Sequence, residues 1–89
     1  MTNILEKANE IVNLRSEEKE RMYGPFNEGM ERAAEILSGM IGQKVNAIFM
    51  YKAMIALKLS RESYCHKEDN LLDAIAYLGA MHNYINNKK

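Results

Sequence analysis

The segment from Ala47 to Tyr64, AIFMYKAMIALKLSRESY, constrains the fold of this chain more than any other. Its first part, AIFMYKAMIAL, is apolar on nearly every side of a helix, so we expect it to form the central and most buried helix. In the rest of the chain β-branched residues are few, and apolar residues recur at helical spacing. The sequence therefore predicts an all-α fold.

Four helices are expected, and short connections join them. Thr2 and Asn46 are the predicted N-caps of the first and third helices, and Gly42 is the predicted C-cap of the second. Pro25 suits the first turn of the second helix, which starts at about Phe26, and the fourth starts at about Lys67. The first helix runs to the neighbourhood of Leu14, or on to Arg21. The other three are predicted over residues 26–41, 46–64 and 67–85.

The length of 89 residues fits a single helical domain, 1–89, and leaves room for only a small core. The last two helices are long and closely connected, so we expect a small bundle dominated by an antiparallel hairpin of the two. A third helix that is apolar all round has little else in so short a chain to cover it. We therefore expect a homo-oligomer.

Composition excludes several classes of protein. Twelve basic residues balance twelve acidic ones, which argues against general nucleic-acid binding or a membrane-surface protein. The sequence has no signal-peptide pattern and no apolar run near the ~20 residues of a membrane span. Cys65 is the only cysteine, so we expect a cytoplasmic protein without an intrachain disulfide, and Cys65, His66 and His82 do not make a zinc site.

Charged residues gather on both sides of the predicted turn near Cys65. In an antiparallel hairpin, Lys58 lies level with Asp73, and Arg61 lies level with Asp69 and Asn70. Tyr77 follows one turn deeper, because Asp69, Asp73 and Tyr77 are spaced i, i+4, i+8. Two cations and two carboxylates are thus expected in one layer between the helices.

This layer has two interpretations. Lys58 and Asp73 both interrupt apolar runs, and an unpaired buried charge is costly, so the residues form either a salt-bridge ladder that sets helix register or a polar ligand pocket. An apolar pair often stabilises a core as well as an ion pair does. Two stacked pairs with a neighbouring asparagine and tyrosine therefore favour the pocket.

The same residues carry a resemblance. Arg21, the Tyr23-Gly24 pair, an amphipathic helix, Lys58-x-x-Arg61 and Asp69-x-x-x-Asp73-x-x-x-Tyr77 follow one another in this order. In this order of motifs, the chain resembles a family of small phage-encoded all-helical proteins of uncharacterised function. The family is associated with nucleotide metabolism or modification. The resemblance covers roughly Arg15 to Tyr84 and implies an α-helical fold and a phage source.

Non-catalytic binding of a nucleotide or nucleotide-derived signalling molecule is the first functional hypothesis, and it needs no cofactor. Arginine and lysine suit phosphates, carboxylates accept from ribose hydroxyls, and tyrosines stack on a base. In a phage-type protein such binding implies a sponge that counters host defence. The candidate ligand-binding residues are Arg21, Tyr23, Lys58, Arg61, Asp69, Asn70, Asp73 and Tyr77.

An Mg²⁺-dependent nucleotide pyrophosphohydrolase is the second hypothesis. The chain is faintly similar to the all-α MazG-like enzymes, which hold Mg²⁺ with a Glu-x-x-Glu helix and a later Glu-x-x-Asp helix. Mg²⁺ prefers such oxygen ligands. The ligands would be Glu28, Glu31, Asp69 and Asp73, but Asp69 and Asp73 are four residues apart, which departs from that pattern, and Lys58 and Arg61 would compete with the metal.

A helical interaction protein that inhibits a host protein is the third hypothesis. In this case the polar cluster around the turn is purely structural. The sequence leaves the three hypotheses open, in the order given.

Overall fold

The computed structural model describes residues 3–14, 19, 21 and 25–87. Helices α1 (Ile4–Asn13), α3 (Phe26–Ile41), α4 (Ala47–Tyr64) and α5 (Glu68–Asn87) make up the fold in this part of the chain. No strand occurs in the described residues. The predicted all-α class is therefore confirmed.

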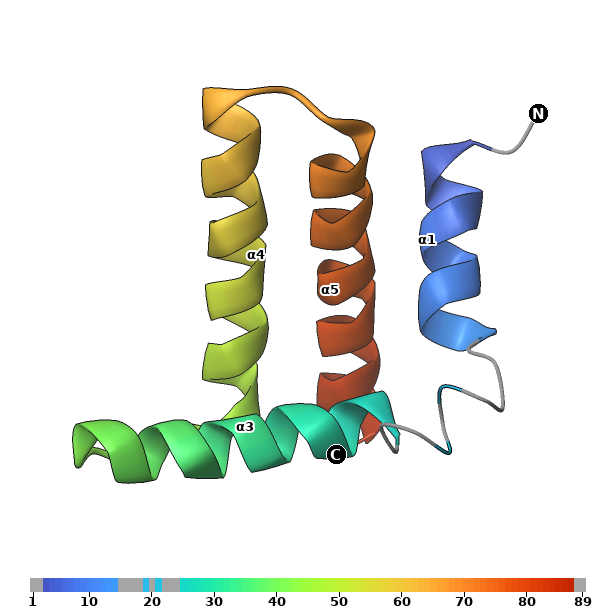
Figure 1. The fold of residues 1–89 in the computed structure, drawn as a ribbon. Coiled ribbons are helices and arrows are strands. Elements are labelled where there is room, and N and C mark those ends of the chain that lie inside the picture. The colour runs from blue at the N-terminus through green and yellow to red at the C-terminus, as the bar shows by residue number, and fades with distance from the viewer. Residues whose placement is uncertain (1–2, 15–18, 20, 22–24, 88–89) are drawn as a thin grey trace.

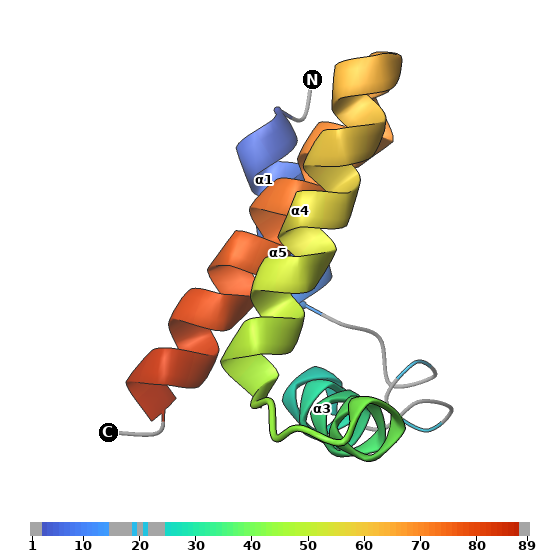
Figure 2. The ribbon, with the colours of Figure 1, turned by 90° about the vertical axis from the view of Figure 1, so that its left-hand side faces the viewer.

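Three of the helices lie side by side in one row, and the fourth crosses their end. Helix α5 runs between α4 and α1, while α3 lies across the end of the row where α4 begins (Figure 1). Figure 2 shows the row edge-on, with α4 and α5 antiparallel and α3 seen nearly along its axis. In the described part of the chain, no second layer of helices covers the two broad faces of this row (Figures 1 and 2).

The central helix is α5, so the prediction that residues 47–64 form the central helix is wrong. Alanines 74, 76 and 80 are buried on α5, and such small side chains let other helices approach closely. Helix α4 packs on one side of α5 only, and large apolar residues on its outer side stay exposed, among them Phe49, Leu57 and Leu59. Helix α3 packs against α4 as well, at the end where α4 begins, and in the described residues no helix covers the outer side of α4 (Figure 1).

Side chains at the helix ends explain where α1 begins and ends. The predicted cap, Thr2, lies outside the described residues, and Asn3 is the N-cap, with its side-chain oxygen accepting from the backbone N–H of Glu6 at 2.9 Å. The backbone of Leu14 leaves the helical region, at φ −122° and ψ 37°. The predicted end near Leu14 is confirmed, and the continuation of this helix to Arg21 is wrong.

The other predicted caps are confirmed. Gly42 ends α3 in the left-handed conformation, at φ 69°, with its N–H donating to the carbonyl oxygen of Ser38. The Asn46 side chain accepts from the backbone N–H of Phe49 at 2.9 Å and so begins α4. Helix α5 begins at Glu68, one residue after the predicted start, and continues to Asn87.

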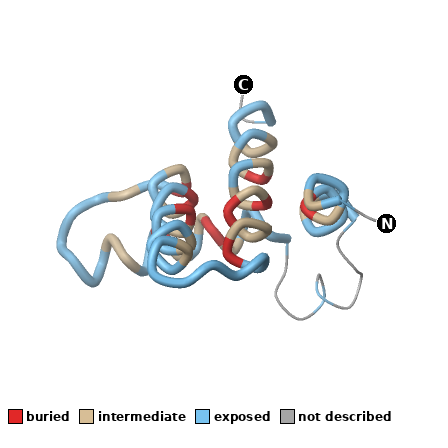
Figure 3. Tube along the Cα trace, turned by 90° about the horizontal axis from the view of Figure 1, so that it is seen from above, coloured by how far each residue is buried: buried red, intermediate tan, exposed pale blue. Residues whose placement is uncertain are grey.

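The core is small and lies in the seams between the helices. Figure 3 shows the buried positions on the sides of the helices that face one another. Met30, Ala47, Tyr51 and Ala80 form the main buried cluster, and further methionines and tyrosines pack partly buried against it. Among the residues described, none of the helices combines the length and the apolar character needed to cross a membrane.

Candidate functional site

An ion pair joins the two helices of the predicted hairpin. Lys58 Nζ on α4 lies 3.0 Å from Asp73 Oδ2 on α5, and the two side chains are 16% and 37% exposed. Their contact confirms that Lys58 lies level with Asp73. Lysine is thus largely shielded from water, with one carboxylate as its partner.

The second predicted pair does not form. Arg61 and Asp69 are both exposed, and no ion pair joins them in the described part of the chain. The residue of α5 that turns toward α4 at this height is Asn70, which is 9% exposed. The polar layer therefore contains one ion pair and not a ladder of two.

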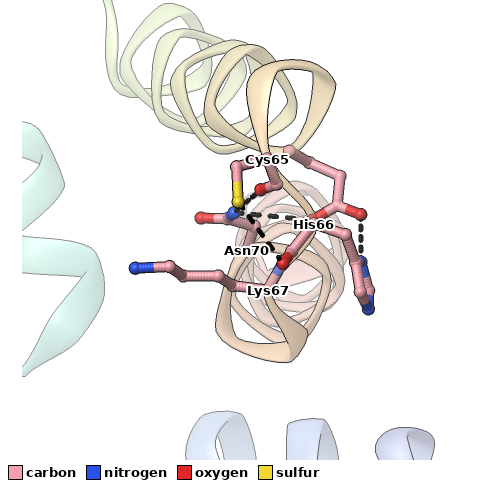
Figure 4. Close-up of polar contacts among 5 residues, drawn as sticks. Cys65, His66, Lys67 and Asn70 are labelled. Carbon is pink, nitrogen blue, oxygen red and sulfur yellow. Dashed lines mark hydrogen bonds and ion pairs between the residues drawn. The ribbon is translucent and has the colours of Figure 1, made fainter.

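Asn70 belongs to a hydrogen-bonded turn that joins α4 to α5 (Figure 4). The carboxylate of Glu62 accepts from the backbone N–H of Lys67 at 3.0 Å and from the Asn70 side-chain amide at 3.4 Å, and it also contacts His66 Nδ1. The same amide donates to the carbonyl oxygen of Cys65 at 3.5 Å. The turn thus engages the amide nitrogen of Asn70, a predicted ligand-binding residue.

These contacts also set the protonation of Glu62. The hydrogen bond with His66 is the largest cause, the backbone N–H of Lys67 adds to it, and together they lower the pKa of the Glu62 carboxyl below its ordinary 4.5. A carboxylate at this place also faces the N-terminus of α5, where negative charge is favoured. Glu62 is therefore a capping residue of the turn.

An apolar cavity opens beside the ion pair, between α1, α3 and α5. Its volume is about 160 Å³. One ionisable carboxylate, that of Asp73, lies in its wall together with the phenol of Tyr77. We call it the α1–α3–α5 pocket, and its lining consists of Ile11, Val12, Phe26, Asp73, Ala76, Tyr77 and Ala80.

Spacing along α5 explains why the pocket forms there. Asp73, Ala76, Tyr77 and Ala80 follow the i, i+3, i+4, i+7 pattern and so share one face of the helix. The two alanines leave space that larger side chains would fill. Phe26, at the first position of α3, closes one side, with its ring centroid 5.7 Å from that of Tyr77.

An aromatic cluster next to the pocket is centred on Tyr51 of α4 and includes Tyr84 of α5. Tyr51 is 1% exposed and packs between the rings of Phe26 and Tyr84, at centroid distances of 6.0 and 5.7 Å. Burial, with the nearby Tyr84 and Glu31, raises the pKa of the Tyr51 phenol to about 12. Tyr84 donates from its hydroxyl to Glu31 Oε2 at 3.0 Å, which places Glu31 in this aromatic cluster.

The carboxylates of the predicted magnesium site do not converge. Within the described ranges, no three His, Cys, Asp or Glu residues lie close enough to hold a metal ion together. Glu28 and Glu31 lie on α3, at one end of the row, while Asp69 lies beside the α4–α5 turn at the other end (Figure 1). The geometry therefore does not support the MazG-like arrangement of ligands.

The remaining predicted residues are spread over the molecule. Asp73 and Tyr77 line the pocket, and Arg21 is exposed. Tyr23 lies outside the described residues. The sequence did not single out Ile11, Val12 and Phe26 as site residues, because their apolar spacing is that of an ordinary core; the signal for Phe26 was an aromatic ring directly after Pro25.

The fold and the pocket define a small all-helical domain with an apolar cavity whose wall includes a carboxylate. The chain belongs to the family described as Domain of unknown function (DUF6378), whose model matches residues 3–85. No curated protein and no solved structure matches the chain significantly. The family match spans the row of three helices together with α3, and the phage source and the MazG-like similarity stay predictions from the motifs.

Proposed function

We propose that this protein binds a nucleotide or nucleotide-derived small molecule without altering it chemically, and that the base of the ligand enters the α1–α3–α5 pocket. The single observation that carries this proposal is the position of Asp73. Its carboxylate lies in the wall of an otherwise apolar, partly aromatic cavity and forms an ion pair with Lys58 of α4.

The size and lining of the cavity support a base as the ligand group. Sites for drug-sized ligands measure roughly 300–1,000 Å³, and this pocket, at about 160 Å³, is smaller. It suits a single heterocycle, whose apolar faces contact Phe26 and Tyr77. Phosphates then remain outside the pocket, and Arg21, which is exposed, is a candidate to bind them.

Asp73 supplies the polar recognition. An ionised carboxylate only accepts hydrogen bonds, so it selects a base that presents an N–H donor. The contact with Lys58 holds this carboxylate in place before the ligand arrives. The dispersed carboxylates support binding without hydrolysis, and binding without turnover is what a sponge for a signalling nucleotide needs.

The experiment is a thermal-shift screen of nucleosides, nucleotides and cyclic dinucleotides, followed by recovery of each ligand after incubation with Mg²⁺. A ligand at 100 times its Kd adds about 2.7 kcal/mol to the free energy of unfolding. We expect at least one nucleotide to raise the melting temperature and to be recovered intact. A panel without any shift, or a ligand recovered hydrolysed, contradicts the proposal.

Two matched variants locate the binding site. Asp73→Asn removes the charge in the pocket wall, and Asp69→Asn makes the same change on an exposed residue outside it. We expect the first to weaken binding at least tenfold and the second to leave it unchanged. Equal losses in both variants would place the ligand at the α4–α5 turn instead.

Self-association, which the sequence predicts, belongs to this proposal as well. The row of helices is one layer thick, whereas domains are usually built from at least two packed layers. A second copy of the chain that packs against this single layer would bury apolar surface that one copy leaves exposed.

A further inference from the structure

We propose that the outer face of α4 packs antiparallel against the same face of a second copy, with the two-fold axis close to Ala56. This inference makes the proposed self-association specific. It does not depend on the ligand, because the α1–α3–α5 pocket and this face lie on different helices.

The outer face of α4 is an uncharged stripe. Its residues lie opposite the buried side of the helix, which carries Ala47, Tyr51 and Ile55, and they cover about a third of the helix circumference. All of them are exposed, and the exposure reaches 48% at Phe49 and 94% at Tyr64. The stripe consists of Phe49, Ala53, Ala56, Leu57, Ser60, Ser63 and Tyr64.

The chain exposes more surface than a compact monomer of its size. Its accessible surface is 6579 Å², whereas a monomer of 10.2 kDa is expected to expose about 5,300 Å². The radius of gyration is 13.9 Å, against an expected value of about 12 Å. The excess is larger than the ~800 Å² that each partner buries in a standard interface, so a stable dimer has enough surface to bury.

The shape of the stripe is complementary to itself. Ala53, Ala56 and Ser60 make the middle of the stripe small, Leu57 lies along one edge of it, and the two ends are bulky, at Phe49 and Tyr64. With a two-fold axis near Ala56, Phe49 of one copy lies level with Tyr64 of the other, and the small centres meet. A two-fold axis pairs the same patch with itself, and the two aromatic pairs at its ends stabilise such contact.

Charge and the position of α3 agree with this arrangement. Lys52 and Arg61 border the stripe on opposite sides of α4. In an antiparallel pair of copies, the Lys52 side of one α4 lies next to the Lys52 side of the other, and likewise for the Arg61 side. Lys52 of one copy therefore does not face Arg61 of the other. The C-terminal half of α3 extends beyond α4 on the side away from α5 (Figure 1). Ile36 and Met40 lie on this half of α3 and are exposed.

The test measures mass in solution and the site of contact. Sedimentation equilibrium at about 10–100 µM should give a dimer for the wild type and a monomer for Ala56→Glu, which places two charges at the axis. Leu78→Glu is the matched control, because Leu78 is a 48% exposed apolar residue on α5, and it should remain dimeric. Circular dichroism checks that both variants are helical.

A disulfide reports the contact even where Ala56→Glu fails to fold. In a Cys65→Ser background, Ala56→Cys should form a covalent dimer on mild oxidation, and Leu78→Cys should not. A wild-type monomer throughout this concentration range overturns self-association and leaves the stripe to a different partner. A dimer that survives Ala56→Glu, without cross-linking through Ala56→Cys, overturns the α4 face.

Discussion

At the scale of single residues, the ion pair of Lys58 and Asp73 decides between architecture and binding. Lys58 is more buried than Asp73, so the lysine depends on the carboxylate, while the carboxylate also faces the pocket. An ion pair held only for stability would gain little over an apolar pair. The proposed ligand site would account for a carboxylate at a cavity wall.

Asp73→Asn should lower the free energy of unfolding by about 1–3 kcal/mol, because Lys58 keeps its burial but loses its charged partner. Replacing the pair, with Lys58→Met and Asp73→Leu, should restore most of that loss, since apolar side chains suit this seam. Urea denaturation measures both effects. The double variant should not bind the nucleotide, and retained binding would show that the pair is structural only.

Glu62→Gln should make stability less dependent on acidic pH. The folded pKa of Glu62 lies below its ordinary 4.5, so the ionised group stabilises the fold above pH 4.5 and this contribution is lost as the pH falls through the folded value. The stability difference between the wild type and Glu62→Gln should therefore shrink below pH 4.5. Glu35→Gln removes one exposed carboxylate from α3 and is the matched control; a difference that is constant with pH would contradict the assigned role of Glu62.

At the scale of elements, local signals account for the helix boundaries. Gly42 and Asn46 act as caps through contacts within a few residues, so the sequence alone predicts where α3 ends and α4 begins. Thr2 and Asn3 are both good capping residues, and sequence does not rank such neighbours. The start of α1 was therefore predicted one residue early.

Asn46→Ala should destabilise the protein by about 1 kcal/mol, because the backbone N–H of Phe49 loses its side-chain acceptor. Asn46→Asp keeps an acceptor at the same place and should retain most of the stability. Thermal and urea unfolding of the two variants give the comparison. Equal losses in both would mean that the amide of Asn46 matters for a contact other than the cap.

The sequence predicts the position of a residue along the helix axis better than the side of the helix on which it lies. Lys58 and Asp73 meet as expected, but Arg61 and Asp69 do not, because Asn70 takes the inner position at that level. Asp73 was predicted as a site residue because it interrupts an apolar run. Tyr77 was predicted because it lies on the same helix face one turn deeper and carries a hydroxyl group. Ile11, Val12 and Phe26 look like core residues, and only the convergence of α1 and α3 on α5 makes them pocket walls.

At the scale of the whole molecule, the helix at the centre was not predictable from hydrophobicity. The apolar character of α4 exceeds what its neighbours in one chain bury, whereas the alanines of α5 permit packing on two sides. The apolar pattern of a helix indicates how much of its surface will be buried. It does not indicate whether the same chain or another chain covers that surface. The error over the central helix is therefore itself an argument for a second copy.

The melting temperature should depend on protein concentration. For a dimer that unfolds to two monomers, a tenfold rise in concentration adds about 1.4 kcal/mol per dimer. Half of this per chain corresponds to roughly 3–5 °C in a domain of this size. Calorimetry between about 1 and 100 µM measures the shift, and Ala56→Glu should melt lower and at a temperature independent of concentration. A wild-type melting temperature that is constant over this range would show that the uncharged stripe of α4 stays open to solvent in the folded protein.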